Sequence, residues 1–151
     1  MTETLSARFA ANTGAPVHLD GKVVVPIYSV EVSAKRRGFT IHRQHAADSP
    51  VPGLSLQART GEIEVNGRRS SHIVLWADTS PQRVDLAVLS GSGCTLNVWN
   101  VWRNGDSMDA WLGNAGMVVT QGDGVTTLEC SSGPGDVDFS DLVVDIERGE
   151  T

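Results

Sequence analysis

The sequence predicts an all-β protein, an antiparallel β-sandwich or jelly roll of about nine to eleven strands. Short stretches of alternating apolar and polar residues recur at intervals of about ten residues, and 16 of the 151 residues are glycine. No comparable stretch keeps the apolar period of an amphipathic helix. A chain of this length can bury a core without a metal or a disulfide. We therefore expect an N-terminal arm over residues 1–15, one β-sandwich domain over 16–148 and a tail over 149–151.

The elements follow from this pattern in chain order. Leu5 and Phe9 have helical spacing, which predicts a helical turn or a docked arm. The expected strands are 23–32, 38–43, 54–58, 62–65, 73–76, 84–89, 95–102, 117–120, 125–130 and 139–146. Pro26 cannot donate a ladder hydrogen bond, so the first of these strands has an edge, a bulge or a break there. Asn66-Gly67 predicts one tight hairpin, and residues 122–124 predict another.

The segment from Leu96 to Trp102 carries apolar residues on both strand faces. Leu96 and Val98 share one parity, whereas Trp99 and Val101 share the other. Either both faces of this strand are covered, or a bulge near Val98 and Trp99 changes the parity. Both alternatives place the strand centrally in its sheet.

Charge and composition exclude several classes of protein. The net charge of −6 argues against a nucleic-acid binder, and no apolar run is long enough for a membrane helix. The first residues lack the apolar core of a secretory signal, so we expect a cytoplasmic location. In that compartment Cys94 and Cys130 are expected to be free thiols. The sequence is compatible with either a monomer or a homo-oligomer.

Acidic residues gather near the C-terminus: residues 104–151 contain ten acids and one base. Asp136, Asp138 and Asp141 lie where a loop meets the last expected strand, and hard cations such as calcium prefer carboxylate oxygens. The segment does not fit an EF-hand, because Asp141 stands where that loop needs glycine. The alternative is that these acids cap turns and keep a sheet edge soluble.

The pattern Asp136-x-Asp138-Phe139-x-Asp141 resembles the D-x-D-F-x-D signature of bacterial jelly-roll domains in exported or surface proteins. Elsewhere the chain resembles uncharacterised bacterial β-sandwich proteins. The resemblance to the jelly-roll domains, which are presumed to bind calcium, implies Asp136, Asp138 and Asp141 as calcium ligands. Asn104 to Asp109 could add oxygens, although their composition favours a turn.

Tryptophan and asparagine suggest a second kind of site. Trp99, Trp102 and Trp111, with Asn100, have the mixture of aromatic faces and amides that binds carbohydrate. The alternative is that these tryptophans fill the core and that their N–H groups find hydrogen-bond partners there. We expect a core position for the fourth tryptophan, Trp76.

We therefore expect a non-catalytic binding or structural module, either with a calcium site at the acidic segment or with no cofactor. Its partner is expected to be a small ligand, a carbohydrate or a protein, and not nucleic acid or a membrane. A carbohydrate-binding module is the first alternative. The second is a small enzyme with a cleft in the sandwich, for which the sequence offers no nucleophile motif and no catalytic residue.

Overall fold

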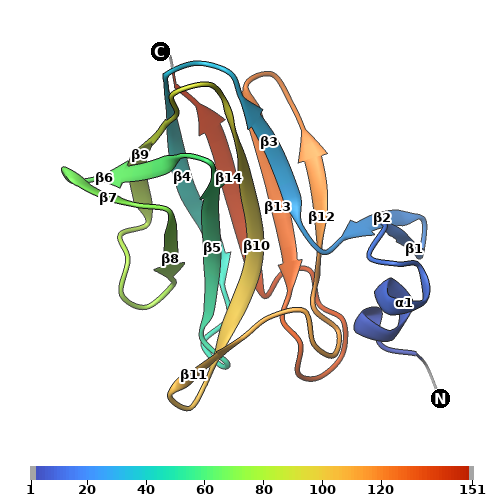
Figure 1. Ribbon diagram of the computed structural model, residues 1–151. Helices are drawn as coiled ribbons and strands as arrows, with labels where there is room; N and C mark the ends of the chain where they lie inside the picture. Colours follow the sequence, from blue (N-terminus) through green and yellow to red (C-terminus); the bar gives the residue numbers. More distant parts are fainter. Residues whose placement is uncertain (1–2, 150–151) are drawn as a thin grey trace.

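The computed structural model describes residues 3–149 and confirms the β-sandwich (Figure 1). A large sheet has the strand order β1-β2-β12-β13-β14-β4-β9-β6-β7, and a small sheet has the order β11-β10-β5-β8, with β3 also paired to β10. Every pairing is antiparallel.

The large sheet consists of β1 (Val17–Leu19), β2 (Lys22–Val25), β4 (Arg36–Ala46), β6 (Glu62–Val65), β7 (Arg68–Ser70), β9 (Arg83–Leu89), β12 (Gly116–Gln121), β13 (Val125–Ser131) and β14 (Leu142–Arg148). The small sheet consists of β3 (Tyr28–Val32), β5 (Pro52–Arg59), β8 (His72–Trp76), β10 (Cys94–Asn104) and β11 (Ser107–Asp109). The described residues thus form more strands than expected. Three of the additional strands, β1, β7 and β11, have three residues each and are too short to show an alternating pattern. The fourth arises because the expected strand 23–32 is divided at Pro26 into β2 and β3.

The main core fills the space between the two sheets. Along β10 the side chains of Leu96 and Val98 point into it and are fully buried. Trp99 and Val101 have the opposite parity and are also buried. The register between β10 and β5 runs without a shift from Thr95 to Trp102. Covering of both faces, and not a bulge, therefore explains the double apolar pattern of this strand.

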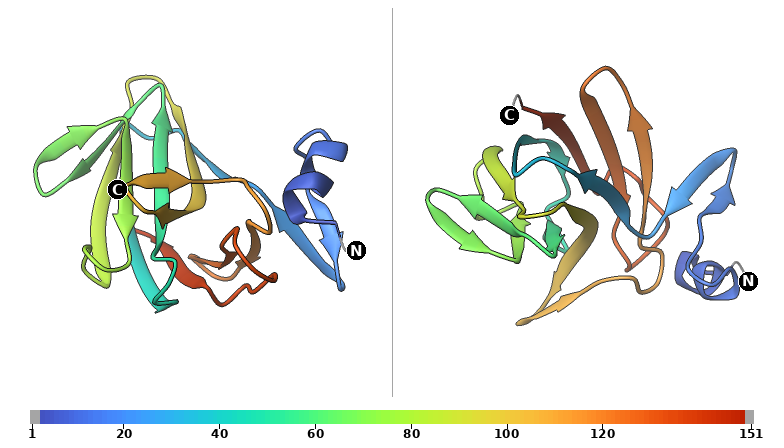
Figure 2. Two further views of the ribbon diagram at one scale, coloured as in Figure 1. Left: turned by 90° about the horizontal axis from the view of Figure 1, so that it is seen from below. Right: turned by 45° about the horizontal axis from the view of Figure 1, so that its top comes forward.

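The N-terminal arm forms helix α1 (Leu5–Ala11), whose N-cap Thr4 accepts a hydrogen bond from the Ala7 amide. With β1 and β2, α1 lies on the side of the molecule opposite the β6–β7 hairpin (Figures 1 and 2). Leu5 and Phe9 are buried in a second, smaller core cluster with Val17 and Val24. Val137 and Phe139, from the acidic C-terminal segment, pack against this cluster.

The expected turns are present. Asn66 and Gly67 have φ angles of 52° and 78°, as a tight hairpin between β6 and β7 requires. Pro26 lies in a break between β2 and β3. Cys94 and Cys130 are buried and free, as predicted. None of the helical residues described builds a segment long or apolar enough to cross a membrane.

Candidate functional site

The outer faces of the two sheets differ in chemistry. On the large sheet, Asp145 accepts hydrogen bonds from Gln44 (2.8 Å) and Thr127 (2.7 Å), so this part of the face is a polar network. On the small sheet, Trp99 on β10 and Trp76 on β8 share a face, because they pair with Ser55 and Gly53 of β5. This face is the outer one, since Asn100 on the opposite parity bonds to Ser131 of the large sheet. The small sheet therefore carries an aromatic surface.

Three rings form a continuous row on this surface, which we call the aromatic row: His72, Trp99 and Trp111. The ring centroids of His72 and Trp99 are 5.5 Å apart with an interplanar angle of 27°. Those of Trp99 and Trp111 are 5.1 Å apart at 28°. Both pairs are stacked, with centroid spacings that are favourable for aromatic contacts.

Trp111 is the exposed end of the aromatic row. It retains 45% of its accessible surface, whereas Trp99 retains 8%. Because Trp99 covers one face of the Trp111 ring, the exposed surface lies on the opposite face and the edges. The Trp111 indole N–H donates to the Pro26 carbonyl at 3.0 Å, which fixes the ring.

The backbone at Trp111 is in an unusual conformation, with φ at 58°. A bulky residue at positive φ costs of order 1–3 kcal/mol and persists only where its surroundings hold it. Such residues cluster at binding and active sites. Trp111 lies in the loop between β11 and β12, and from there its side chain reaches Trp99.

Ser55 and His72 form the other end of the row. The Ser55 Oγ and His72 Nε2 atoms are 2.5 Å apart. Ser55 is fully buried, so its hydroxyl cannot reach a substrate. No carboxylate among residues 3–149 hydrogen-bonds to His72, so the pair lacks the acid of a catalytic triad. The bond instead orients the His72 ring against Trp99.

Polar groups border the aromatic row on the same face. Asn97 on β10 accepts a hydrogen bond from the Ser29 hydroxyl at 2.7 Å, and Gln57 on β5 is exposed and directly opposite Asn97. Glu31 accepts from Thr95 at 2.9 Å. The groups nearest the row are thus largely neutral amides and hydroxyls.

Trp76 corrects one expectation, because it does not lie in the interior. It is half-buried on the outer face, over Gly53, where an added Cβ would come within 2.7 Å of its ring. The Arg103 guanidinium lies 4.7 Å from the Trp76 ring centroid and pairs with both oxygens of Asp78 at 2.7 and 3.0 Å. Trp76 therefore extends the aromatic surface.

Two of the expected carbohydrate-binding residues lie elsewhere. Asn100 and Trp102 have the inner parity of β10 and are buried. The Asn100 amide donates to the Ser131 carbonyl at 2.8 Å, which ties the small sheet to the large one. Neither residue can contact a ligand on the outer face. The structure thus brings together only Trp99 and Trp111 of the four.

The acidic segment forms a hydrogen-bonded turn. Asp138 Oδ1 accepts from the Ser140 amide at 2.9 Å and from the Ser140 hydroxyl at 2.5 Å. Asp141 Oδ2 accepts from the Ser132 amide at 3.0 Å. The Ser140 hydrogen bonds lower the pKa of Asp138, and burial raises the pKa of Asp141. Asp136 is exposed at the start of the turn.

These carboxylates fit a calcium ion poorly. Within residues 3–149 no three His, Cys, Asp or Glu side chains are arranged so that they could hold a metal. One oxygen each of Asp138 and Asp141 already accepts from the turn itself, whereas calcium takes six to eight oxygens. Asn104 bonds to Asp109 at 3.0 Å within the β10–β11 hairpin, as its turn-like sequence suggests. Calcium binding stays a prediction from the sequence pattern alone.

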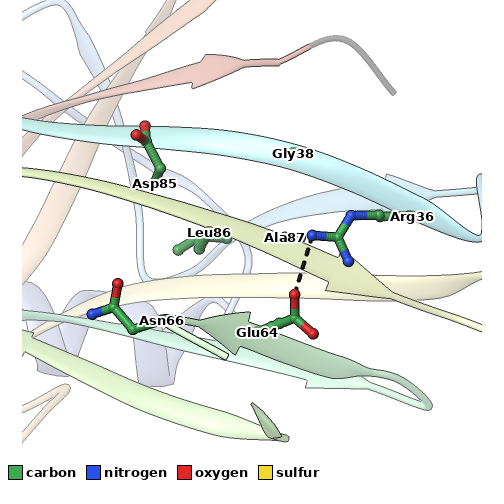
Figure 3. A pocket seen from close by; sticks show the side chains of 7 residues that line it. All are labelled: Arg36, Gly38, Glu64, Asn66, Asp85, Leu86 and Ala87. Carbon is green, nitrogen blue, oxygen red and sulfur yellow. Dashed lines mark hydrogen bonds and ion pairs between the residues drawn. The ribbon is translucent and has the colours of Figure 1, made fainter. Parts of the chain in front are cut away.

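Several surface hollows lie outside the aromatic row, and two of them bear on the choice of site. One, of about 260 Å³, lies on the large sheet, and Gly38 and Ala87 are among the residues that line it. Figure 3 shows Arg36 and Glu64 joined at one end of this hollow, with Asp85 and Asn66 at the other. Glu64 bonds to Arg36 and Arg69 at 3.1 Å each, and these bonds lower its pKa. The Arg36 and Glu64 charges of this hollow are therefore paired with each other, and Asp85 bonds to Thr40 and Arg83 outside it.

The other hollow, of about 390 Å³, lies at the end of the small sheet. Its apolar wall includes Trp102, Leu112 and Pro134. It adjoins the aromatic row through the loop that carries Trp111 and Leu112.

Comparisons of the chain with models of protein families, with curated proteins and with solved structures found no match. The functional argument therefore depends on the site itself.

Sequence reasoning missed His72 and Ser55. The two are 17 positions apart, and no motif connects them. Only the pairing of β5 with β8 brings them together.

Proposed function

We propose that this protein is a non-catalytic carbohydrate-binding module, and that a sugar ring stacks on Trp111 at the outer face of the small sheet. The observation that carries the proposal is the half-exposed Trp111, which is fixed against Trp99 and held at positive φ.

The chemistry of the face supports a sugar as the ligand. A pyranose ring has an apolar face that packs on an aromatic ring and hydroxyls that need amide or hydroxyl partners. Trp111 supplies the first. Asn97, Gln57 and His72 lie toward the other end of the row, where they would bond the hydroxyls of a neighbouring unit of an oligosaccharide. Because the Arg103 guanidinium is already paired with Asp78, it is not free to bind an anionic sugar, and we take a neutral sugar as the ligand.

The geometry also sets the expected strength of binding. The row stacks its rings on one another and leaves a single free platform, Trp111. One aromatic platform with a few exposed hydrogen bonds favours weak binding, with a Kd on the order of 0.1–1 mM, which corresponds to about −5.5 to −4.1 kcal/mol.

The test is affinity electrophoresis through gels that contain soluble neutral glucan, xylan or mannan. We expect at least one polysaccharide to retard the protein and Trp111→Asn to abolish the retardation. Asparagine tolerates positive φ, so this variant keeps the loop conformation while it removes the ring.

The matched control is Leu112→Ala, because Leu112 is the next residue and is more exposed than Trp111. This control should be retarded like the wild type. Free migration of the wild-type protein in all three gels would refute the proposal, as would equal retardation of the Trp111→Asn variant.

A further inference from the structure

We infer that Asn114 is the positioning residue of this site, and that through it helix α1 and the turn at residues 133–135 hold Trp111 in its binding orientation. The inference rests on the proposed function, since it concerns how that same site is kept ready for its ligand.

Asn114 joins three separate parts of the chain. Its side-chain oxygen accepts a hydrogen bond at 3.2 Å from the amide of Leu5, in the first turn of α1. Its side-chain amide donates to the Gly135 carbonyl at 2.7 Å. Its backbone amide donates to the Gly133 carbonyl at 2.9 Å. Asparagine is suited to this position because its side chain both donates and accepts.

The neighbouring residue strengthens the same connection. The Gly113 carbonyl accepts from the Ser6 amide at 2.8 Å, which is a second link to α1. Gly113 has a φ of 55°, and an added Cβ would lie 2.5 Å from the Gly133 carbonyl oxygen. The loop that carries Trp111 is therefore packed directly on the loop before the acidic turn.

These contacts hold the backbone of the loop, whereas the ring has its own contacts. Trp111 touches Trp99 and donates to Pro26 through its ring, whereas the positive φ belongs to its backbone. The bonds of Asn114, three residues further along, hold this backbone because they fix where the loop returns to the core. Without them the strained conformation relaxes, and the tryptophan spends less time on Trp99.

The acidic segment acquires a role in this arrangement. Val137 and Phe139 pack on the α1 cluster, and the serine bonds of Asp138 and Asp141 shape the turn that follows Gly135. The segment thus holds the loop that Asn114 binds.

The first experiment measures Trp111 directly, without a ligand. Two indoles stacked 5.1 Å apart give an exciton-coupled circular dichroism band. We expect Asn114→Ala to lose most of this band, as Trp111→Asn does. The control is Asn12→Ala, which also removes a side-chain amide, in this case from the N-terminal arm. This amide donates to the Pro16 carbonyl and not to the loop that carries Trp111, so the control should keep the band.

The second experiment repeats the electrophoresis with the polysaccharide that retards the wild type. We expect Asn114→Ala to weaken binding by about tenfold, because a mobile Trp111 ring must then be ordered when the ligand binds, and this costs free energy of binding. We expect Asn12→Ala to have no effect on binding. Asn114→Asp keeps the acceptor for Leu5, so it serves as a milder variant if Asn114→Ala does not fold, and it should show an intermediate loss.

The outcomes separate the two claims. A full exciton band in folded Asn114→Ala overturns the positioning role, whatever the protein binds. A lost band with unchanged retardation also overturns it. If Asn114→Ala loses the exciton band but no polysaccharide retards the wild-type protein, the carbohydrate site is refuted and the positioning role is not.

Discussion

Gly133 allows the two loops at the end of the sandwich to touch. An added Cβ at this position would lie 2.3 and 2.5 Å from two atoms of the Trp102 ring and 2.6 Å from the Leu112 carbonyl oxygen. Trp102 is buried in the interior and cannot move aside without disturbing the core. The absence of a side chain at Gly133 is therefore a packing requirement.

We expect Gly133→Ala to lower the free energy of unfolding by about 1–3 kcal/mol, the usual cost of overpacking a core. Urea denaturation measures the loss as a lower transition midpoint. Gly91→Ala is the control, because nothing lies within 4 Å of a Cβ there. Equal midpoints for the two variants would show that Trp102 is less constrained than the contacts indicate.

The acidic turn before β14 illustrates how burial and hydrogen bonds compete at the level of an element. Burial raises the pKa of Asp141, so the folded protein binds this proton more tightly than the unfolded chain. The charged carboxylate therefore destabilises the fold above its ordinary pKa, and the penalty vanishes at lower pH, where both states are protonated.

Asp141→Asn should remove this penalty, since an amide oxygen can still accept from Ser132. We expect the variant to be more stable than the wild type at about pH 6 and the gain to disappear near pH 3. Denaturation across this range provides the test. A gain that stays constant with pH, or one that grows on acidification, would contradict the stated cause.

Calcium provides a second test of the same element. An ion at 100 times its Kd adds about 2.7 kcal/mol of stability, or about 5–11 °C in melting temperature for a domain of this size. Because the described carboxylates form no group that could hold a metal, we expect the melting temperature in millimolar calcium to match that in chelator. A rise of this size would instead support the calcium site that the D-x-D-F-x-D pattern predicts.

At the scale of the whole molecule, the period-two pattern was sufficient to predict two antiparallel sheets. The apolar residues on both faces of segment 95–102 predicted the central position of β10, and the Asn66-Gly67 pair predicted the hairpin between β6 and β7, because each signal lies in residues close in the chain. Leu5 and Phe9 likewise predicted a helical turn or a docked arm, and the arm forms a helix that is also docked.

The candidate site was only partly predictable. The parity of Trp99 and Trp102 is visible in the sequence, but which parity faces solvent depends on which face of the small sheet packs on the large sheet. The row also needs His72 from another strand and Trp111 from a loop at positive φ, a conformation that its residue type does not suggest. The residues that form the aromatic row therefore depend on long-range strand pairing and on a strained backbone conformation, neither of which the sequence pattern shows.

The central claim is that ligands bind at the outer face of the small sheet. Nuclear magnetic resonance tests it most directly, because each of the 4 tryptophans gives its own indole N–H signal. During titration with a neutral oligosaccharide, the account predicts shifts at Trp111 and Trp99 and none at the buried Trp102. Shifts confined to the residues around Glu64 or the acidic turn, with the Trp111 signal unmoved, would contradict it.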